Sequence, residues 1–302
     1  LDVEVLEPGK TVVPAKLAAE AVRKLPSGAV TMAAADGEVE ITGNGPRFRL
    51  REFVVGDFPE IADTIETPIV EIDGEKFVSA LSQVGVAASA DDARPTLTGV
   101  LFESSDDGLR LVATDSYRLA FRELPGISTG VDALVPYRAL REVGRTIGDA
   151  KLGVQLDSRE AAFSSERGRM TARIIEATFP NYRQLLPDSY PNRLTISKPL
   201  LLEAVGRAAL VAEDHIPVRM SLHDGGVELS VTRQEVGEET EHIEAEYDGE
   251  EMTIAFNTRY LTDGVSAVGG DEVVLETIDP LKPGMLSGGG DGFQYLLMPV
   301  RL

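Results

Sequence analysis

The sequence predicts an α+β protein of repeated domains, in which each half-domain packs one helix on several antiparallel strands. Three segments share one layout: a short strand, a polar or proline helix start, an amphipathic helix and then further strands. Pro14, Pro136 and Asn257 take equivalent places in them, with steps of 122 and 121 residues. Insertions this small over such lengths indicate a shared fold. The segments begin at TVVPAKLAAEAVRKL (11–25), ALVPYRALREVGRTI (133–147) and TIAFNTRYLTDGVSAV (253–268).

A different half-unit separates these segments. Residues 68–124 fit a strand, a helix at 76–89 and two hairpins. Residues 194–247 repeat that order with a helix at 198–212, two strands, an acidic loop and another strand. Each complete domain therefore combines one half-unit of each type.

These boundaries predict three domains. We expect the second half of a domain at 1–67 and two complete domains at 68–192 and 193–302. Because the chain starts in the second half of a domain, three complete domains would need about 60 more residues before Leu1.

The composition is that of a folded, acidic protein. The net charge is −21, from 29 basic and 50 acidic residues, which at first sight disfavours a protein held on DNA by bulk electrostatic attraction. The absence of cysteine excludes disulfides and thiolate metal sites. Because no run of 18 apolar residues and no signal-peptide pattern occurs, we expect a cytoplasmic protein with no membrane partner.

Signals of catalysis are weak. His215, His223 and His242 lack metal-ligand spacing, so we expect no metal, and no motif predicts a cofactor. The GxSxG match at 126–130 follows Pro125 and leads into a strand, whereas a nucleophile elbow needs a strand before it and a helix after it. The glycines between 288 and 292 fit a flexible hairpin tip. Nothing in the sequence therefore supports catalysis.

The predicted helices combine an apolar stripe with exposed bases. In 15–25 the stripe is Leu17, Ala18, Ala21, Val22 and Leu25, spaced for one buried side. A basic row alone is usually a solvated surface, but its recurrence on equivalent helices favours a role in binding. The basic residues on these helices are Lys16, Arg23, Lys24, Lys76, Arg138, Arg141, Arg145, Lys198, Arg207 and Arg259.

Several motifs carry a family resemblance along the whole chain. They are PTLTGVLFE, LVATDSYRLA, LVPYRALRE, FPNYRQLLP, FNTRYL and the terminal YLLMPVRL. With them the chain resembles the bacterial DNA polymerase III β subunits, the sliding clamps. The resemblance implies a DNA-clamp fold and a head-to-tail dimeric ring around double-stranded DNA, without catalysis or base-specific recognition. It also implies a clamp loader, the polymerase catalytic subunit, and other polymerases or repair proteins as partners.

A ring would also explain the acidic balance. Topology retains a closed ring, so a few Lys and Arg residues facing the phosphates suffice, whereas base-specific contacts would obstruct sliding. The acidic remainder can face outward and limit unspecific association with nucleic acid.

The resemblance further implies a peptide-binding pocket between the second and third domains, where Arg118 would orient the peptide backbone. Tyr117 stands where the family often has histidine, and Gln184 where it often has a basic residue, which affects partner preference. Core packing is the competing interpretation for Leu119, Leu185 and Met298. One subsite would comprise Leu97, Thr114, Ser116, Tyr117, Arg118, Leu119, Pro180, Gln184, Leu185, Leu296, Met298 and Arg301. The neighbouring groove would comprise Asn257, Tyr260, Leu281, Pro283 and Pro299.

The dimer contact is placed by the same resemblance. Phe48 and Leu50 would face Leu210 and Val211 of the other subunit, with core packing as the alternative for the last two. Two other classes stay open: a protein-only scaffold with the same repeats, and a hydrolase that uses Ser128 or an acidic pair.

Overall fold

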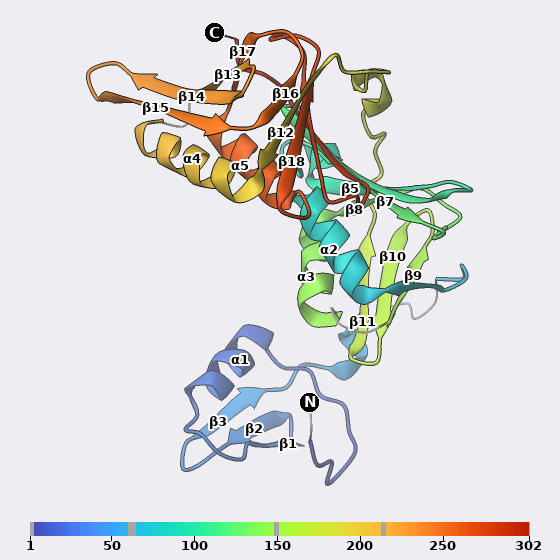
Figure 1. The fold of residues 1–302 in the computed structure, drawn as a ribbon. Coiled ribbons are helices and arrows are strands. Elements are labelled where there is room, and N and C mark those ends of the chain that lie inside the picture. Colours follow the sequence, from blue (N-terminus) through green and yellow to red (C-terminus); the bar gives the residue numbers. More distant parts are fainter. Residues whose placement is uncertain (1–2, 60–64, 148–150, 213–215, 302) are drawn as a thin grey trace. The chain divides into compact units, whose positions relative to one another are not determined.

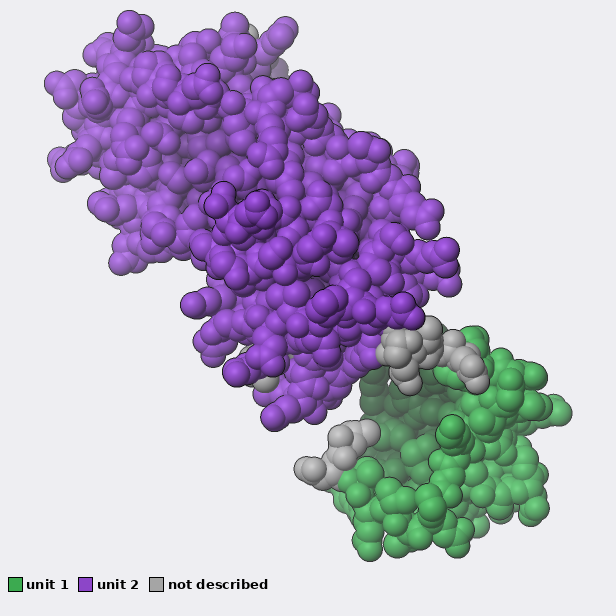
Figure 2. All heavy atoms as spheres, turned by 90° about the vertical axis from the view of Figure 1, so that its right-hand side faces the viewer, with its two compact units in different colours: residues 1–64 green, residues 65–302 purple. Residues whose placement is uncertain are grey.

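The computed structural model describes residues 3–59, 65–147, 151–212 and 216–301 (Figure 1). The chain folds as two compact units, unit 1 at Leu1–Thr64 and unit 2 at Ile65–Leu302 (Figure 2). The described helices are too short or too polar to cross a membrane.

Unit 1 packs one helix on a small antiparallel sheet of β1, β2 and β3. Its core is Val39, Ile41 and Leu50, against which Ala18 and Leu25 of the predicted stripe pack. The stripe is buried only in part, because the short strands cover one side of the helix and leave Leu17 and Val22 49% and 41% exposed. The elements are α1 (Ala15–Lys24), β1 (Thr31–Ala35), β2 (Glu38–Thr42), β3 (Arg47–Arg51) and the 3-10 turn η1 (Val55–Asp57).

The described residues of unit 2 form three antiparallel sheets. Their strand orders are β11-β10-β9-β4, β16-β12-β18-β19-β20-β7-β6-β5-β8 and β15-β14-β13-β17. The strands of the first two sheets are β4 (Val70–Asp73), β5 (Gly99–Ser104), β6 (Gly108–Thr114), β7 (Arg118–Pro125), β8 (Ala133–Pro136), β9 (Lys151–Leu156), β10 (Glu160–Ser165), β11 (Gly168–Arg173), β12 (Asn192–Ser197), β16 (Glu246–Asp248), β18 (Glu272–Thr277), β19 (Gly284–Ser287) and β20 (Phe293–Leu297). Those of the third are β13 (Val218–His223), β14 (Gly226–Arg233), β15 (Gly237–Glu244) and β17 (Met252–Phe256).

Four helices form one layer over these sheets (Figure 1). α2 packs against α3 and also touches α5, which packs against α4. Side chains of Asp73 and Asn257 cap α2 and α5 by accepting main-chain N–H bonds, of which the polar start at Asn257 was expected from the sequence. The helices are α2 (Gly74–Gly85), α3 (Tyr137–Ile147), α4 (Lys198–Val211) and α5 (Thr258–Ala267), with 3-10 turns η2 (Pro95–Thr98) and η3 (Tyr182–Leu185).

The nine-stranded sheet crosses the predicted domain boundary at 192/193. β20, near the end of the chain, pairs with β7 in a register from Phe293 opposite Arg122 to Leu297 opposite Arg118. Main-chain hydrogen bonds therefore join the predicted second and third domains.

The internal repeat is visible in the main chain. Phe53 N–H donates to Val12 C=O at 2.8 Å, and Ile175 N–H donates to Leu134 C=O at 2.7 Å. In the third copy Val300 N–H donates to Ala255 C=O at 2.8 Å. The three acceptors are again 122 and 121 residues apart, so the repeated fold expected from the sequence is confirmed.

Two local predictions were wrong. The acidic stretch after β14 is not a loop: β15 pairs with β14 over its whole length, from Gly237 opposite Arg233 to Glu244 opposite Gly226. Its glutamates are tolerated because β15 ends the sheet and most of its side chains are exposed. The helix expected at 76–89 ends at Gly85, and Pro95 opens a 3-10 turn before the strand.

Candidate peptide-binding site

A cavity of about 240 Å³ lies where three stretches of unit 2 meet. They are the turn between β6 and β7, the segment around η3, and the end of β20. Nine of the predicted subsite residues line it, whereas Leu97, Tyr117 and Arg301 do not. The lining residues are Thr114, Ser116, Arg118, Leu119, Pro180, Asn181, Tyr182, Gln184, Leu185, Leu296 and Met298.

The turn between β6 and β7 is fixed by its own side chains. Asp115 Oδ1 accepts the N–H groups of Tyr117 and Arg118 at 2.9 and 3.1 Å. Thr114 Oγ1 donates to Arg118 C=O at 2.7 Å and accepts Ser116 N–H at 3.2 Å. These bonds hold Ser116 at φ +83°, a left-handed conformation that few non-glycine residues adopt. The sequence TDSYR thus builds one rigid wall.

The floor and rim of the cavity differ in burial. Leu119 and Leu296 face each other on paired strands, are each 1% exposed, and belong to a small core with Tyr182. Core packing is therefore correct for Leu119. It is wrong for Leu185 and Met298, which are 43% and 37% exposed. These two side chains offer apolar surface at the rim.

A polar network holds the opposite wall. Tyr182 Oη donates to Glu103 at 2.7 Å and accepts from Arg110 at 3.2 Å, while Arg183 also binds Glu103 at 2.7 Å. Burial acts to raise the pKa of Glu103, but the bonds from Tyr182 and Arg183 outweigh it and leave this pKa below its ordinary value. Asn181 and Tyr182 were missing from the predicted lining, although FPNYRQLL contains them.

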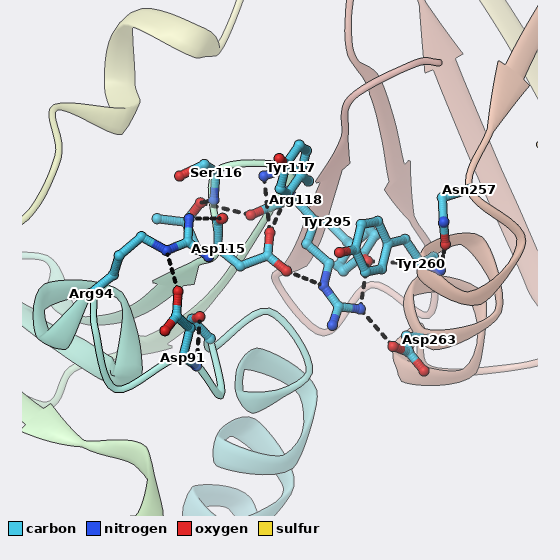
Figure 3. A network of polar contacts seen from close by, with 12 residues as sticks. Asp91, Arg94, Asp115, Ser116, Tyr117, Arg118, Asn257, Tyr260, Asp263 and Tyr295 are labelled. Carbon is cyan, nitrogen blue, oxygen red and sulfur yellow. Dashed lines mark hydrogen bonds and ion pairs between the residues drawn. The ribbon is translucent and has the colours of Figure 1, made fainter. Parts of the chain in front are cut away.

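The guanidinium of Arg118, which was expected to orient a bound peptide, is held by two carboxylates of the chain (Figure 3). Its Nε donates to Asp115 at 2.9 Å and its Nη1 to Asp263 on α5 at 2.6 Å. Burial would lower the pKa of Arg118, but the Tyr295 hydroxyl and the two carboxylates outweigh burial and raise this pKa. The Arg118 side chain is 8% exposed and forms a wall of the cavity. Its positive charge is paired with Asp115 and Asp263.

The predicted neighbouring groove is less well formed. Asn257 Oδ1 accepts Tyr260 N–H at 3.0 Å and so caps α5. The Tyr260 ring stacks on Tyr117, with centroids 6.3 Å apart and an interplanar angle of 27°. Leu281 is 69% exposed, and Pro283 and Pro299 are half-buried.

Two of the ten predicted DNA-facing bases form hydrogen bonds with other groups of the chain. Lys198 Nζ donates to Ser266 C=O at 3.0 Å and to Val268 C=O, because a cation stabilises the C-terminal end of α5. Arg207 makes two bonds to Glu241 on β15, at 2.7 and 2.8 Å. Arg145 pairs with Glu142 at 3.1 Å but stays exposed. The others are also exposed: Lys16, Arg23, Lys24, Lys76, Arg138, Arg141 and Arg259.

The four predicted dimer residues differ in how deeply they are buried. Leu50 is 4% exposed and belongs to the core of unit 1, so its side chain cannot face a partner, and Phe48 is half-buried against that core. Leu210 is 85% exposed, which excludes core packing, whereas Val211 packs in part on the core of unit 2.

The hydrolase hypothesis finds no support near Ser128. Its hydroxyl lies 2.9 Å from Ser104 Oγ in a loop before β8. His223 and His242 stack on each other with centroids 5.4 Å apart, and His215 lies outside the described residues. Within the described parts of the chain, His, Asp and Glu form no group that could hold a metal.

Comparison with known proteins decides the family. Residues 71–181 match the model of the DNA polymerase III beta subunit central domain, and residues 183–301 match that of its C-terminal domain. The beta sliding clamp of Streptomyces coelicolor is 33% identical over 321 residues, covering 100% of this chain and 85% of the relative. The chain belongs to the beta sliding clamp family.

Solved clamps agree with the fold. The Caulobacter crescentus beta sliding clamp has a TM-score of 0.92 at 29% identity, over 98% of this chain and 83% of that one. A Pseudomonas aeruginosa sliding clamp bound to griselimycin has a TM-score of 0.90 at 25% identity, over 98% and 82%. As a beta sliding clamp, the chain is a processivity factor of DNA replication and not a catalyst.

Proposed function

We propose that two copies of this clamp close head to tail into a ring that encircles double-stranded DNA without reading its sequence. A clamp loader would place it there, in the cytoplasm, and the catalytic subunit of DNA polymerase III would be tethered to it. The observation that carries the proposal is the continuous layer of α2, α3, α4 and α5 with exposed bases in a chain of net charge −21. Domains at 1–67, 68–192 and 193–302 would each supply helices to the pore.

The DNA-facing surface would consist of the bases that remain exposed on the helices. Arg138 and Arg141 on α3, Lys76 on α2 and Arg259 on α5 can reach phosphates. Lys198 and Arg207 of α4 are instead bonded to the end of α5 and to Glu241 of β15. A sparse set of this kind binds weakly, and weak contacts allow sliding.

Ring closure would join β3 of one copy to β15 of the other. Among the described strands, each of the two pairs with one neighbour only, so each offers a row of main-chain groups to a new strand. Their charges are opposite, which favours β3–β15 pairing over self-pairing of either strand. β3 exposes Arg47, Arg49 and Arg51, the first two of which pair with Glu40 of β2. β15 carries Glu238, Glu239 and Glu244, besides Glu241, which is bonded to Arg207.

The cavity would receive partner proteins through a short extended peptide. Its floor of Leu119 and Leu296 and its rim of Leu185 and Met298 suit aliphatic or aromatic anchors. Polymerases and repair proteins would share this docking site.

Retention on DNA tests the ring. The full-length clamp, loaded on nicked circular DNA, should stay through high salt and should leave when the circle is cut. A protein held by charge would leave both forms at similar rates as salt rises. Equal salt sensitivity on circular and linear DNA would exclude encirclement.

Peptide titration tests the pocket. The probe is an extended peptide with Gln, then Leu, and a terminal Leu-Phe pair. Met298→Ala should weaken its binding by about 1–2 kcal/mol, roughly tenfold, because an anchor contact at the rim is lost. Exposed Arg301 lies outside the cavity and provides a matched control, since Arg301→Ala should change affinity less. Equal binding by Met298→Ala and the unmodified clamp would show that the pocket is misplaced.

A further inference from the structure

Asp263 lies outside the cavity but contacts one of its walls. It is on α5, and its Oδ2 accepts from Arg118 Nη1 at 2.6 Å (Figure 3). Arg118 lies 145 residues away in sequence, on β7, and lines the cavity. The bond therefore links a helix of the predicted third domain to the cavity wall of the second.

Arg118 is held from several sides. Asp115 takes its Nε at 2.9 Å, the Tyr295 hydroxyl lies 3.4 Å from Nη1, and the Tyr260 ring centre lies 4.3 Å from Cζ. The Tyr295 hydroxyl also donates to Tyr260 C=O at 2.8 Å. These contacts fix the guanidinium on the α5 side, and the cavity beside it stays open.

Among the described residues, Asp263 is the carboxylate bonded to Nη1, whereas Asp115 is bonded to Nε. Asp115 Oδ1 accepts two main-chain N–H groups and its Oδ2 accepts Arg118 Nε, so both oxygens of this carboxylate are already engaged away from Nη1. The Asp263 side chain is 33% exposed, which leaves room for substitution, whereas Arg118 is 8% exposed. Without Asp263, Nη1 would lose its charged partner, and the guanidinium could turn into the cavity that Arg118 lines.

The same contacts reach the rim. Tyr117 stacks on the Tyr260 ring that Arg118 covers, and Tyr117 C=O accepts Met298 N–H at 2.9 Å. A shift of Arg118 would therefore displace the main chain that carries Met298.

We propose that Asp263 is a positioning residue of the peptide pocket, which keeps the Arg118 guanidinium out of the cavity so that an apolar peptide anchor can enter. This inference rests on the proposed peptide-binding function of the cavity. It predicts that a residue without peptide contact controls peptide affinity, and that it does so only through Arg118.

A double-mutant cycle on the full-length clamp tests the inference with the peptide defined above. Asp263→Asn keeps the size of the side chain but removes its charge, and should weaken binding by about tenfold, the scale of one anchor contact. Asp263→Glu should restore affinity to within about threefold. In an Arg118→Met background, Asp263→Asn should have no further effect. Asp271→Asn, which removes an exposed charge before β18, is the matched control and should bind as the unmodified clamp does.

The outcomes separate the two proposals. If Met298→Ala weakens binding but Asp263→Asn does not, the positioning role is wrong and the pocket stands. If the unmodified clamp does not bind the peptide, both are wrong. An equal loss from Asp263→Asn with and without Arg118 would show that Asp263 acts by another route. If Asp263→Asn does not fold, the double variant Arg118→Met with Asp263→Asn is used, because it contains no unpaired cation. A peptide affinity of this double variant below that of Arg118→Met alone would overturn the proposal.

Discussion

Replacing a glycine by alanine should lower the stability of unit 2 when it is made in α5 and raise it when it is made in α4. Gly264 on α5 lies against Tyr295, and a Cβ there would come 2.4 Å from its ring. Tyr295 is 0% exposed and is bonded to Tyr260 and Arg118, so its ring cannot move aside. On α4, a Cβ at Gly206 would meet no atom within 4 Å. Gly206→Ala is therefore the control for helix propensity.

The two effects can be estimated separately. Alanine stabilises a helix interior over glycine by about 1 kcal/mol. Overpacking a well-filled core costs up to about 3 kcal/mol, so Gly264→Ala should destabilise unit 2 by about 2 kcal/mol. At about 2–4 °C per kcal/mol, the melting temperature should fall by about 4–8 °C for Gly264→Ala and rise by about 2–4 °C for Gly206→Ala. Calorimetry measures both, and a rise for Gly264→Ala would refute the close packing against Tyr295.

Three further outcomes are expected. Leu50→Asp buries an unpaired charge and should abolish the folding of unit 1, which limited proteolysis would detect. Leu210 is exposed, so Leu210→Asp should keep the melting temperature and give monomers in light scattering. Burial raises the pKa of Asp291, but bonds from Gln83, a main-chain N–H and Arg122 outweigh it and lower this pKa. Asp291 therefore stabilises the fold above the ordinary carboxyl range and loses that effect as pH falls through its lowered pKa, so Asp291→Asn should flatten the loss of stability in acid urea titrations. Ser128→Ala should leave DNA retention unchanged, and a loss would reopen the hydrolase hypothesis.

The internal repeat was predictable because equivalent residues recur at nearly equal steps along the sequence. Pro14, Pro136 and Asn257 precede helices at equal steps, and the main-chain bonds of the structure follow the same steps. A local signal was enough for the start of α5, where the Asn257 side chain caps the first turn. It was not enough for α2, which begins at Gly74 after an Asp73 cap and not at residue 76. The acidic strand β15 was missed since glutamates weaken the strand pattern, and pairing with β14 outweighs that preference.

The cavity was predictable in outline but not in its charges. The motifs named nine of its lining residues, because each motif is continuous in sequence. Asp263, which pairs with Arg118, and the partners of Lys198 and Arg207 come from other elements, and a single sequence shows no such pairs. Burial was equally hidden: Leu50 and Leu210 look alike in sequence, yet one is core and the other is surface.

The three equivalent main-chain bonds also bear on how such a chain can evolve. Val12, Leu134 and Ala255 accept through carbonyl oxygens, and Phe53, Ile175 and Val300 donate through amide N–H groups. A bond between main-chain groups needs no particular side chain at either end, except that proline cannot be the donor. Copies of one fold can therefore keep this bond while their side chains differ. The cavity beside Pro180 is built from side chains of the second and third copies, and none of the six residues of these bonds lines it.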